Sequence, residues 1–186
     1  MAIINTCAIT VGNLQGIGPQ CADNIGGIKR VFLCLNGDVD TVTAANGEVT
    51  AITMVVDEGT ARKFKEYSFR KATGGMTSTA TVNDAVGTIF YTTELQLQFS
   101  AMTKEKNVEI NNITRQGLKA IVEDRKGNYW YLGKDDAVTA TAAVAQAGTA
   151  YEDLNGYTLT LSDVSLSMPL AVDPTLITDT LIDFNE

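Results

Sequence analysis

The stretch TIFYTTELQLQFSAM, residues 88–102, decides the fold class of this chain. In its second half Leu95, Leu97 and Phe99 alternate with polar residues. Successive side chains of a strand point to opposite faces, so the three hydrophobic residues share one face. The polar positions of the other face are Glu94, Gln96, Gln98 and Ser100. The pattern predicts a long β-strand with one buried face and one polar face.

A short helix and a hairpin are predicted directly after this strand. Thr103 is a suitable N-cap for a helix over residues 104–116, with Val108 and Ile113 facing inward and Gly117 ending it. Residues 118–123 and 129–132 then read as two strands joined by the polar turn DRKGN at 124–128.

Further strands are predicted on both sides of this unit. They cover residues 28–35, 48–56, 61–71 and 157–168. The last of these changes its apolar phase near Asp163, which predicts a bulge. Two segments rich in small and polar residues, 74–87 and 134–156, are predicted to be loops. The chain is therefore expected to be mainly β, antiparallel, with one short helix.

The length of 186 residues favours a single domain. We place it at residues 28–170, after a glycine-rich N-terminal arm at 1–27 and before a C-terminal segment at 171–186. An apolar segment of this kind is expected to dock on its own domain or on a neighbouring subunit. Its apolar residues are Leu176, Ile177, Leu181, Ile182 and Phe184.

The composition argues against several classes of function. A net charge of −8 disfavours a protein that grips nucleic acid through a basic surface. The chain has no histidine, which removes the commonest general base and imidazole metal ligands, so we expect no enzyme, no metal and no cofactor. Three cysteines, all near the N-terminus, fit a reducing compartment, and no apolar run predicts a membrane span. Gly12–Gly18 lacks the spacing of a phosphate-binding loop, and Asp38 and Asp40 do not fit a calcium-binding loop.

One cationic patch stands out in this acidic chain. Its residues are Arg62, Lys63, Lys65, Arg70 and Lys71. Two interpretations stay open: contact with an acidic neighbouring subunit or with DNA, or a solvated edge strand whose charges prevent unwanted pairing.

Two segments carry a resemblance to a known family: CADNIGGIKRVF at Cys21–Phe32, and the final strand that begins GYTLTL at Gly156–Leu161. With the order of strand, helix, hairpin and Ala/Gly/Thr-rich loop, the chain resembles tail-tube-like structural proteins of tailed bacteriophages, most of all those of phages that infect Bacteroidetes. The resemblance implies a β-sandwich or barrel with a flanking helix. It also implies a homo-oligomer that forms stacked, commonly hexameric rings with a continuous inner wall of sheets, through which DNA is ejected.

On that basis the expected location is the virion tail, with synthesis in the host cytoplasm. The expected partners are other copies of the chain, other tail or neck proteins, and double-stranded DNA in non-specific passage. The face of Glu94, Gln96, Gln98 and Ser100 would line the lumen, although a solvated sheet face demands the same polarity. The cationic patch and the C-terminal segment would make contacts between subunits.

Two alternatives remain. The first is another virion component on a similar scaffold: a neck or head-completion ring, a tail-barrel ring or a capsid decoration protein. The second is a receptor- or carbohydrate-binding β-domain, for which Tyr129, Trp130 and Tyr131 are the candidate platform. Three consecutive aromatic residues of a strand cannot share one face, so core or interface packing is the favoured use.

Overall fold

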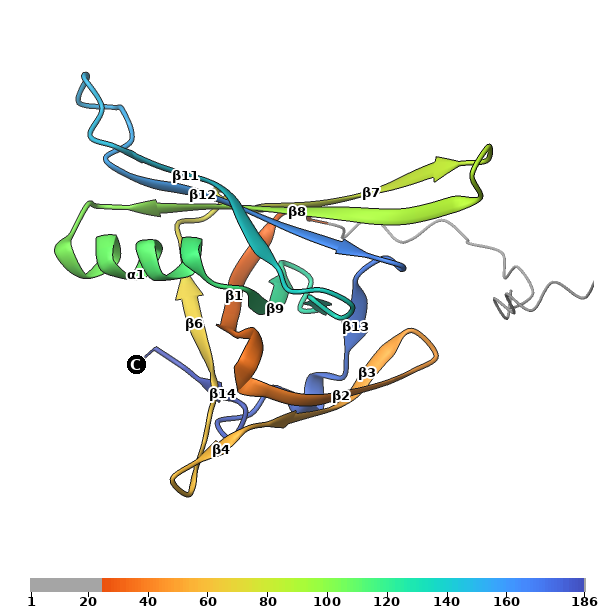
Figure 1. Ribbon diagram of the computed structural model, residues 1–186. Helices are drawn as coiled ribbons and strands as arrows, with labels where there is room; N and C mark the ends of the chain where they lie inside the picture. Colours follow the sequence, from red (N-terminus) through yellow and green to blue (C-terminus); the bar gives the residue numbers. More distant parts are fainter. Residues whose placement is uncertain (1–24, 186) are drawn as a thin grey trace, which may run out of the picture.

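The computed structural model describes residues 25–185, which form a mainly β domain with a single α-helix (Figure 1). Two curled sheets lie in a sandwich-like arrangement. This confirms the predicted fold class. The expected N-terminal arm at 1–27 falls almost wholly outside the described residues.

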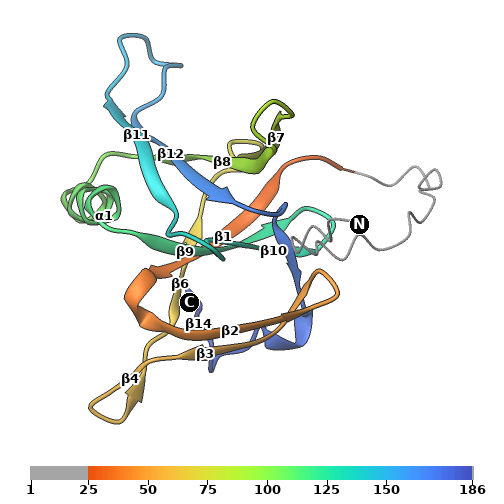
Figure 2. The same ribbon diagram turned by 45° about the vertical axis from the view of Figure 1, so that its right-hand side comes forward.

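The larger sheet has eight strands and forms the lower layer of the molecule in Figure 1. In spatial order they are β14 (Ile182–Asp183), β6 (Phe64–Ser68), β1 (Ile28–Leu35), β9 (Leu118–Asp124), β10 (Tyr129–Leu132), β13 (Leu170–Val172), β3 (Glu48–Met54) and β2 (Val39–Ala45). The sheet bends round on itself (Figure 2) and encloses a core that includes Phe32, Phe64, Tyr131 and Ile182.

The smaller sheet has four strands, all antiparallel to their neighbours. In spatial order they are β11 (Thr139–Gln146), β12 (Gly156–Ser165), β8 (Thr88–Ser100) and β7 (Gly75–Asn83). The remaining elements are two 3-10 turns, η1 (Asn36–Asp38) and η2 (Pro174–Leu176), the small hairpin of β4 (Val56–Asp57) and β5 (Thr60–Ala61), and helix α1 (Lys104–Arg115).

The decisive strand β8 has the predicted alternation. Leu95 and Leu97 are fully buried, and they lie opposite Leu161 and Leu159 of β12. These four leucines join the second core, which also takes side chains from α1, β1 and β9. Burying one face of the small sheet in this way removes a large apolar area from water and holds the two layers together.

Helix α1 begins as predicted and packs differently. The Thr103 hydroxyl oxygen accepts a hydrogen bond from the Lys106 N–H at 3.3 Å, which confirms the N-cap. Ile110 and Ile113 are buried, whereas Val108 is exposed, so the prediction for Val108 was wrong. Residues 110 and 113 are one turn apart and share a face, while residue 108 points away from the sheet.

Both predicted loops contain a strand. Residues 74–87 hold β7 and residues 134–156 hold β11, and both strands are the outermost of the small sheet. Their side chains are small or hydroxylated and mostly exposed on both faces. An exposed strand of this kind is held by backbone pairing to its neighbour, so no apolar alternation marks it in the sequence.

The predicted bulge at Asp163 is also absent. Pairing between β12 and β8 runs without a shift from Gly156 to Ser165. Asp163 therefore occupies the buried face, while Val164 on the outer face is 46% exposed. Similarly, the strand expected over 61–71 is interrupted, since β5 ends at Ala61 and β6 covers only Phe64–Ser68.

The C-terminal segment is part of the domain. β14 pairs in parallel with β6, placing Ile182 opposite Phe64. Leu181 and Ile182 are buried, and Leu176, Ile177 and Phe184 pack against the same core. These five residues were expected to dock on their own domain or on a neighbouring subunit, and the resemblance assigned them to contacts between subunits. In this chain they pack on their own domain, where they supply apolar side chains that close the curled interior of the larger sheet.

Candidate assembly surface

The outer face of the four-stranded sheet is polar and almost free of charge. Gln98, Gln96 and Glu94 of β8 lie opposite Thr158, Thr160 and Ser162 of β12. Glu94 and Gln96 are exposed, and Gln98 and Ser100 are half-buried. The four residues predicted to form one polar face thus do so, and β12 doubles its width with hydroxyl groups.

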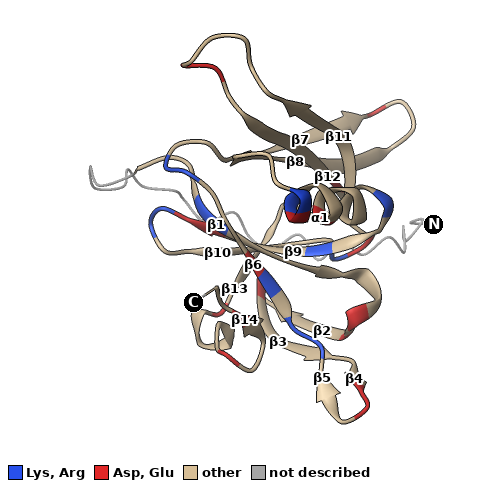
Figure 3. Cartoon of the chain, turned by 90° about the vertical axis from the view of Figure 1, so that its left-hand side faces the viewer, with Lys and Arg blue, Asp and Glu red and all other residues tan. Residues whose placement is uncertain are grey.

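Hydroxyl groups continue onto β7, whereas β11 adds small apolar side chains on the other side of this pair. Thr77 and Thr79 of β7 flank Glu94 and Thr92, while Ala142 and Val144 of β11 flank Thr160 and Thr158. None of the four strands contains lysine or arginine. Their two acidic residues are Glu94 on the outer face and Asp163, which is buried on the inner face. Figure 3 shows these strands tan over nearly all their length.

Neither outer strand of this sheet pairs with a further strand among the described residues, although α1 packs beside β11 and Val138, directly before β11, bridges Leu118 of β9. β7 pairs only with β8, and β11 pairs only with β12. The edge sequences, GMTSTATVN and TATAAVAQ, contain neither charge nor proline. Soluble proteins usually protect exposed edges with lysine, proline, bulges or very short strands, because the free N–H and C=O groups otherwise pair with another chain.

The larger sheet protects its edges in that usual way. Its outermost strand beside β6 is the two-residue β14, where Lys65 forms an ion pair with Asp183. Lys63 donates a hydrogen bond of 2.6 Å to the carbonyl oxygen of Asp179. The opposite edge, β2, carries Asp40 and has two register irregularities in its pairing with β3. The contrast is clearest for β7, whose pairing with β8 is regular, because β11 also has a register irregularity, between Ala140 and Ala142.

The directions of the open edges are compatible with each other. Each of the three neighbouring pairs in the small sheet is antiparallel, so β7 and β11 also run in opposite directions. A second copy that brings its β11 beside β7 would therefore continue the sheet in antiparallel fashion. Because the two edges differ, such a contact is head-to-tail, and a head-to-tail contact closes into a ring when the rotation allows.

The predicted cationic patch is divided in the structure (Figure 3). Arg62 pairs with Asp57 at 2.5 Å, and Lys63 and Lys65 bind the C-terminal segment as described. Together they border a groove of about 550 Å³ beside α1. Arg70 and Lys71 lie apart from it in the β6–β7 turn, exposed and without an ion-pair partner among residues 25–185. Lys63 and Lys65 thus lie at the β14 edge, Arg62 pairs beside the β4–β5 hairpin, and Arg70 and Lys71 have no ion-pair partner among the described residues.

The aromatic residues of β10 do not form a platform. Tyr131 is buried in one core, and Trp130 packs against the other and donates a hydrogen bond to Asp124 Oδ2 at 3.4 Å. Core packing accounts for both.

No metal cluster and no membrane-length helix occur in the described part of the chain. Within it, no three Asp, Glu or Cys side chains come together in a way that would hold an ion. None of its helices has the length and apolar character needed to cross a bilayer.

Burial raises the pKa of Asp163, and the neighbouring Asp135 and Asp136 raise it further, against opposing effects from the Gly133 N–H and Lys119.

No family model, no curated protein and no solved structure matches this chain. The polar face could be predicted from the sequence, whereas the edges were not predicted. The signal that could have found them is the absence of charge and proline from two segments rich in threonine and alanine, residues 75–83 and 139–146.

Proposed function

We propose that this chain is a structural subunit that joins edge to edge into rings, and that the rings stack into the DNA-conducting tail tube of a bacteriophage virion. The observation that carries the proposal is the pair of open, uncharged edges on one four-stranded sheet, β7 and β11, which run in opposite directions. The assignment to a phage tail rests in addition on the sequence resemblance at Cys21–Phe32 and Gly156–Leu161.

The polar face suits the lining of a channel for DNA. Lysine and arginine retain nucleic acid, because binding releases the counterions of its phosphates. The outer face of β7, β8, β11 and β12 offers mainly hydroxyl and amide groups, with Val144 and Val164 as exposed apolar positions, Glu94 as its charge, and no cation. DNA that passes such a wall meets hydrogen-bonding groups without a site that holds it.

Six copies give a channel of suitable width. Four strands from each copy, about 4.8 Å apart and tilted by about 40°, close into a barrel about 150 Å in circumference and about 48 Å across between backbones. Side chains narrow this opening and still leave room for a duplex. Ring number follows here from the resemblance, and the strand geometry is compatible with it.

Edge variants test the mode of association. Thr79→Lys with Thr81→Lys places two charges on the outer face of β7, and Ala142→Lys with Val144→Lys does the same on β11. If β7 joins β11, each variant alone stays monomeric, since every contact needs both edges. A mixture of the two forms a 1:1 dimer, because each supplies the edge that the other lacks. Mass in solution and negative-stain electron microscopy give the readout.

The control variant, Thr158→Lys with Thr160→Lys, adds the same charge to the inner strand β12 and should leave rings intact. Homodimers of either edge variant would show like-with-like pairing of edges and exclude a head-to-tail ring. A wild-type chain that stays monomeric at high concentration would overturn the proposal. Rings that never lengthen into tubes, even with other virion proteins, would favour the neck-ring alternative.

A further inference from the structure

The β7–β8 hairpin projects beyond the body of the domain (Figure 1). Val82 and Ile89 lie opposite each other near its tip, on the face that further along the strands packs into the core. They are 57% and 49% exposed, and Val86 in the turn is 72% exposed. Apolar residues of this kind at the end of an arm are typical of a contact with another chain.

The tip itself has a defined shape. The Asn83 side-chain oxygen accepts from the Ala85 N–H at 3.2 Å, and the Val86 N–H donates to the Asn83 carbonyl at 3.3 Å. Gly87 adopts a φ of +69°, which lets the chain turn back into β8. A pre-formed turn loses little conformational entropy when it binds. Asp84 is the single charged residue in β7, the turn and the adjoining half of β8.

A groove lies at the opposite end of the same sheet. It has a volume of about 550 Å³ and is bordered by Arg70 and Thr73 of the β6–β7 turn, by Gln98 and Ser100, and by Glu152 and Leu154 of the β11–β12 loop. The loop is held in shape because the Asp153 carboxylate accepts hydrogen bonds of 2.8 Å from the N–H groups of Thr149 and Ala150. The groove is therefore also pre-formed.

The tip and the groove are complementary in chemistry. The tip offers the Asp84 carboxylate, the Asn83 side-chain amide and the apolar Val86. The groove and its rim offer the free cations Arg70 and Lys71, the Glu152 carboxylate and Leu154. Strand β8 separates the two features, since it begins beside the tip at Thr88 and ends beside the groove at Ser100. One chain cannot bring them together, whereas two copies displaced along the strand direction can.

We infer that the tip of the β7–β8 hairpin docks into the groove between the β6–β7 turn and the β11–β12 loop of a second copy, and that this contact joins one ring to the next. The inference rests on the proposed function, because the contact runs along the strands and the edges supply the contact around the ring. Repeated head-to-tail contacts of this kind do not close and therefore build a filament.

Charge exchange tests the contact. Asp84→Arg and Arg70→Glu should each abolish tubes and leave single rings, as seen by electron microscopy and sedimentation. A chain that carries both substitutions should recover tubes, because the opposite charges meet again with their places exchanged. Asp40→Arg, on the exposed strand β2 of the other sheet, is the matched control and should form tubes of wild-type length.

The outcomes separate this inference from the proposed function. If the wild-type chain forms no rings, the edge contact of the proposed function is contradicted. Wild-type rings that do not stack, or tubes of normal length in both single variants, overturn the hairpin contact while ring formation stands. Failure of the double variant to recover tubes also overturns the pairing of Asp84 with Arg70.

Discussion

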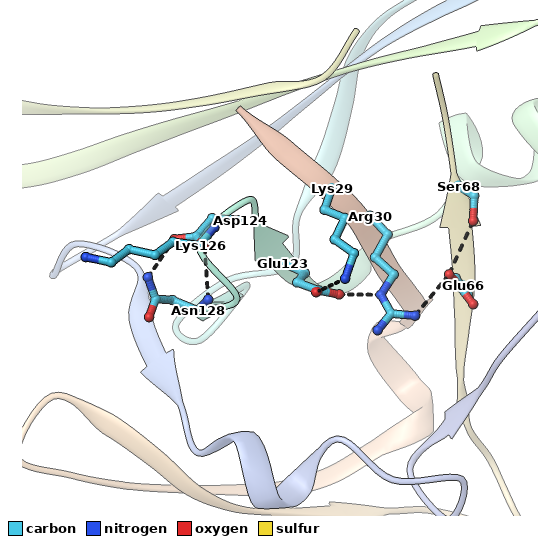
Figure 4. Close-up of polar contacts among 8 residues, drawn as sticks. All are labelled: Lys29, Arg30, Glu66, Ser68, Glu123, Asp124, Lys126 and Asn128. Carbon is cyan, nitrogen blue, oxygen red and sulfur yellow. Dashed lines mark hydrogen bonds and ion pairs between the residues drawn. The ribbon is translucent and has the colours of Figure 1, made fainter. Parts of the chain in front are cut away.

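Arg30 of β1 donates a hydrogen bond from its Nε to the Oε2 atom of Glu123 on β9, where Glu123 is only 2% exposed (Figure 4). Lys29 Nζ lies 2.7 Å from the other carboxylate oxygen. Arg30 also reaches Glu66 at 3.3 Å, and Glu66 accepts the Asn185 N–H at 3.0 Å. A chain of polar contacts thus ties the C-terminal segment to the centre of the larger sheet.

The first prediction concerns this ion pair. Arg30→Ala leaves the buried Glu123 carboxylate with one cationic partner, and we expect it to lower the free energy of unfolding by about 2–4 kcal/mol. The matched control is Arg62→Ala, which breaks an ion pair exposed on both sides and should cost less than about 1 kcal/mol. Urea denaturation at pH 7, in the background of the lysine-substituted β7 edge, measures both without interference from assembly. Equal losses would show that burial of Glu123 does not strengthen the contact.

The second prediction concerns Asp163, which is 2% exposed and whose Oδ1 atom has no hydrogen-bond partner among the described residues. Burial raises the pKa of Asp163 above its unfolded value. At pH values between these two pKa values, Asp163 is protonated in the folded state and ionised in the unfolded state. The folded state therefore binds one proton more, and the free energy of unfolding falls as pH rises through this window. Asp163→Asn replaces the carboxylate by a neutral amide and so removes the cost of burying a negative charge. We expect a higher urea midpoint than wild type at pH 7, with the difference shrinking toward pH 4. A difference in urea midpoint that stays constant at all pH values would contradict the role of ionisation. Asp40→Asn, on the exposed strand β2, is the control.

The third prediction concerns Gly156, where β12 begins beside the end of β8. A Cβ atom at this position would lie 2.0 Å from the Phe99 carbonyl oxygen, which is part of the backbone and cannot move aside. Gly156→Ala should therefore force the strands apart and lower the free energy of unfolding by about 1–3 kcal/mol. At Gly37 a Cβ atom would meet nothing within 4 Å, so Gly37→Ala should be nearly neutral. Thermal denaturation gives the melting temperatures of the two variants. Similar values for both would show that the backbone around Gly156 has room for a methyl group.

The fourth prediction concerns the buried Cys34. Burial, with a smaller contribution from Asp38, raises the pKa of its thiol far above the usual range, so little reactive thiolate exists. With Cys7 and Cys21 replaced by serine, Cys34 should react with a thiol reagent only as fast as the domain opens. The reaction should accelerate with urea in step with unfolding. Thr50→Cys in the same background, at an exposed position of β3, gives the rate for an accessible thiol. Equal rates for both positions in native buffer would contradict burial of Cys34.

The sequence predicted those elements whose burial differs between their two faces. Leu95 and Leu97 alternate with Glu94 and Gln96 because one face of β8 packs on the core and the other does not. β7 and β11 escaped prediction because both of their faces are mostly exposed and most of their residues are small. Such strands form because their backbone pairs with a strand elsewhere in the chain, and the residues of the strand alone do not indicate this pairing.

The remaining errors have a local cause. A bulge was expected near Asp163 because the apolar residues change phase there, yet β12 keeps its register through Ser165. The apolar residues after that point, Val164, Leu166 and Met168, are exposed instead of buried. The apolar C-terminal residues were predicted to dock, and whether they dock on the same chain or a neighbour depends on the curl of the larger sheet. The polar face was predictable, whereas its continuation onto β7 and β11 depends on register that only the fold provides.

The open edges of β7 and β11 also bear on how assembly would end. A linear row of copies joined through these edges always has one free edge at each end, however long it becomes. When the two ends of a short curved row meet, the last contact forms within a single particle, at a high effective concentration and without the loss of another freely diffusing molecule. Closure then leaves no free edge to recruit further copies around the circle. In such an assembly the curvature of the sheet, more than the supply of subunits, sets the size of the ring.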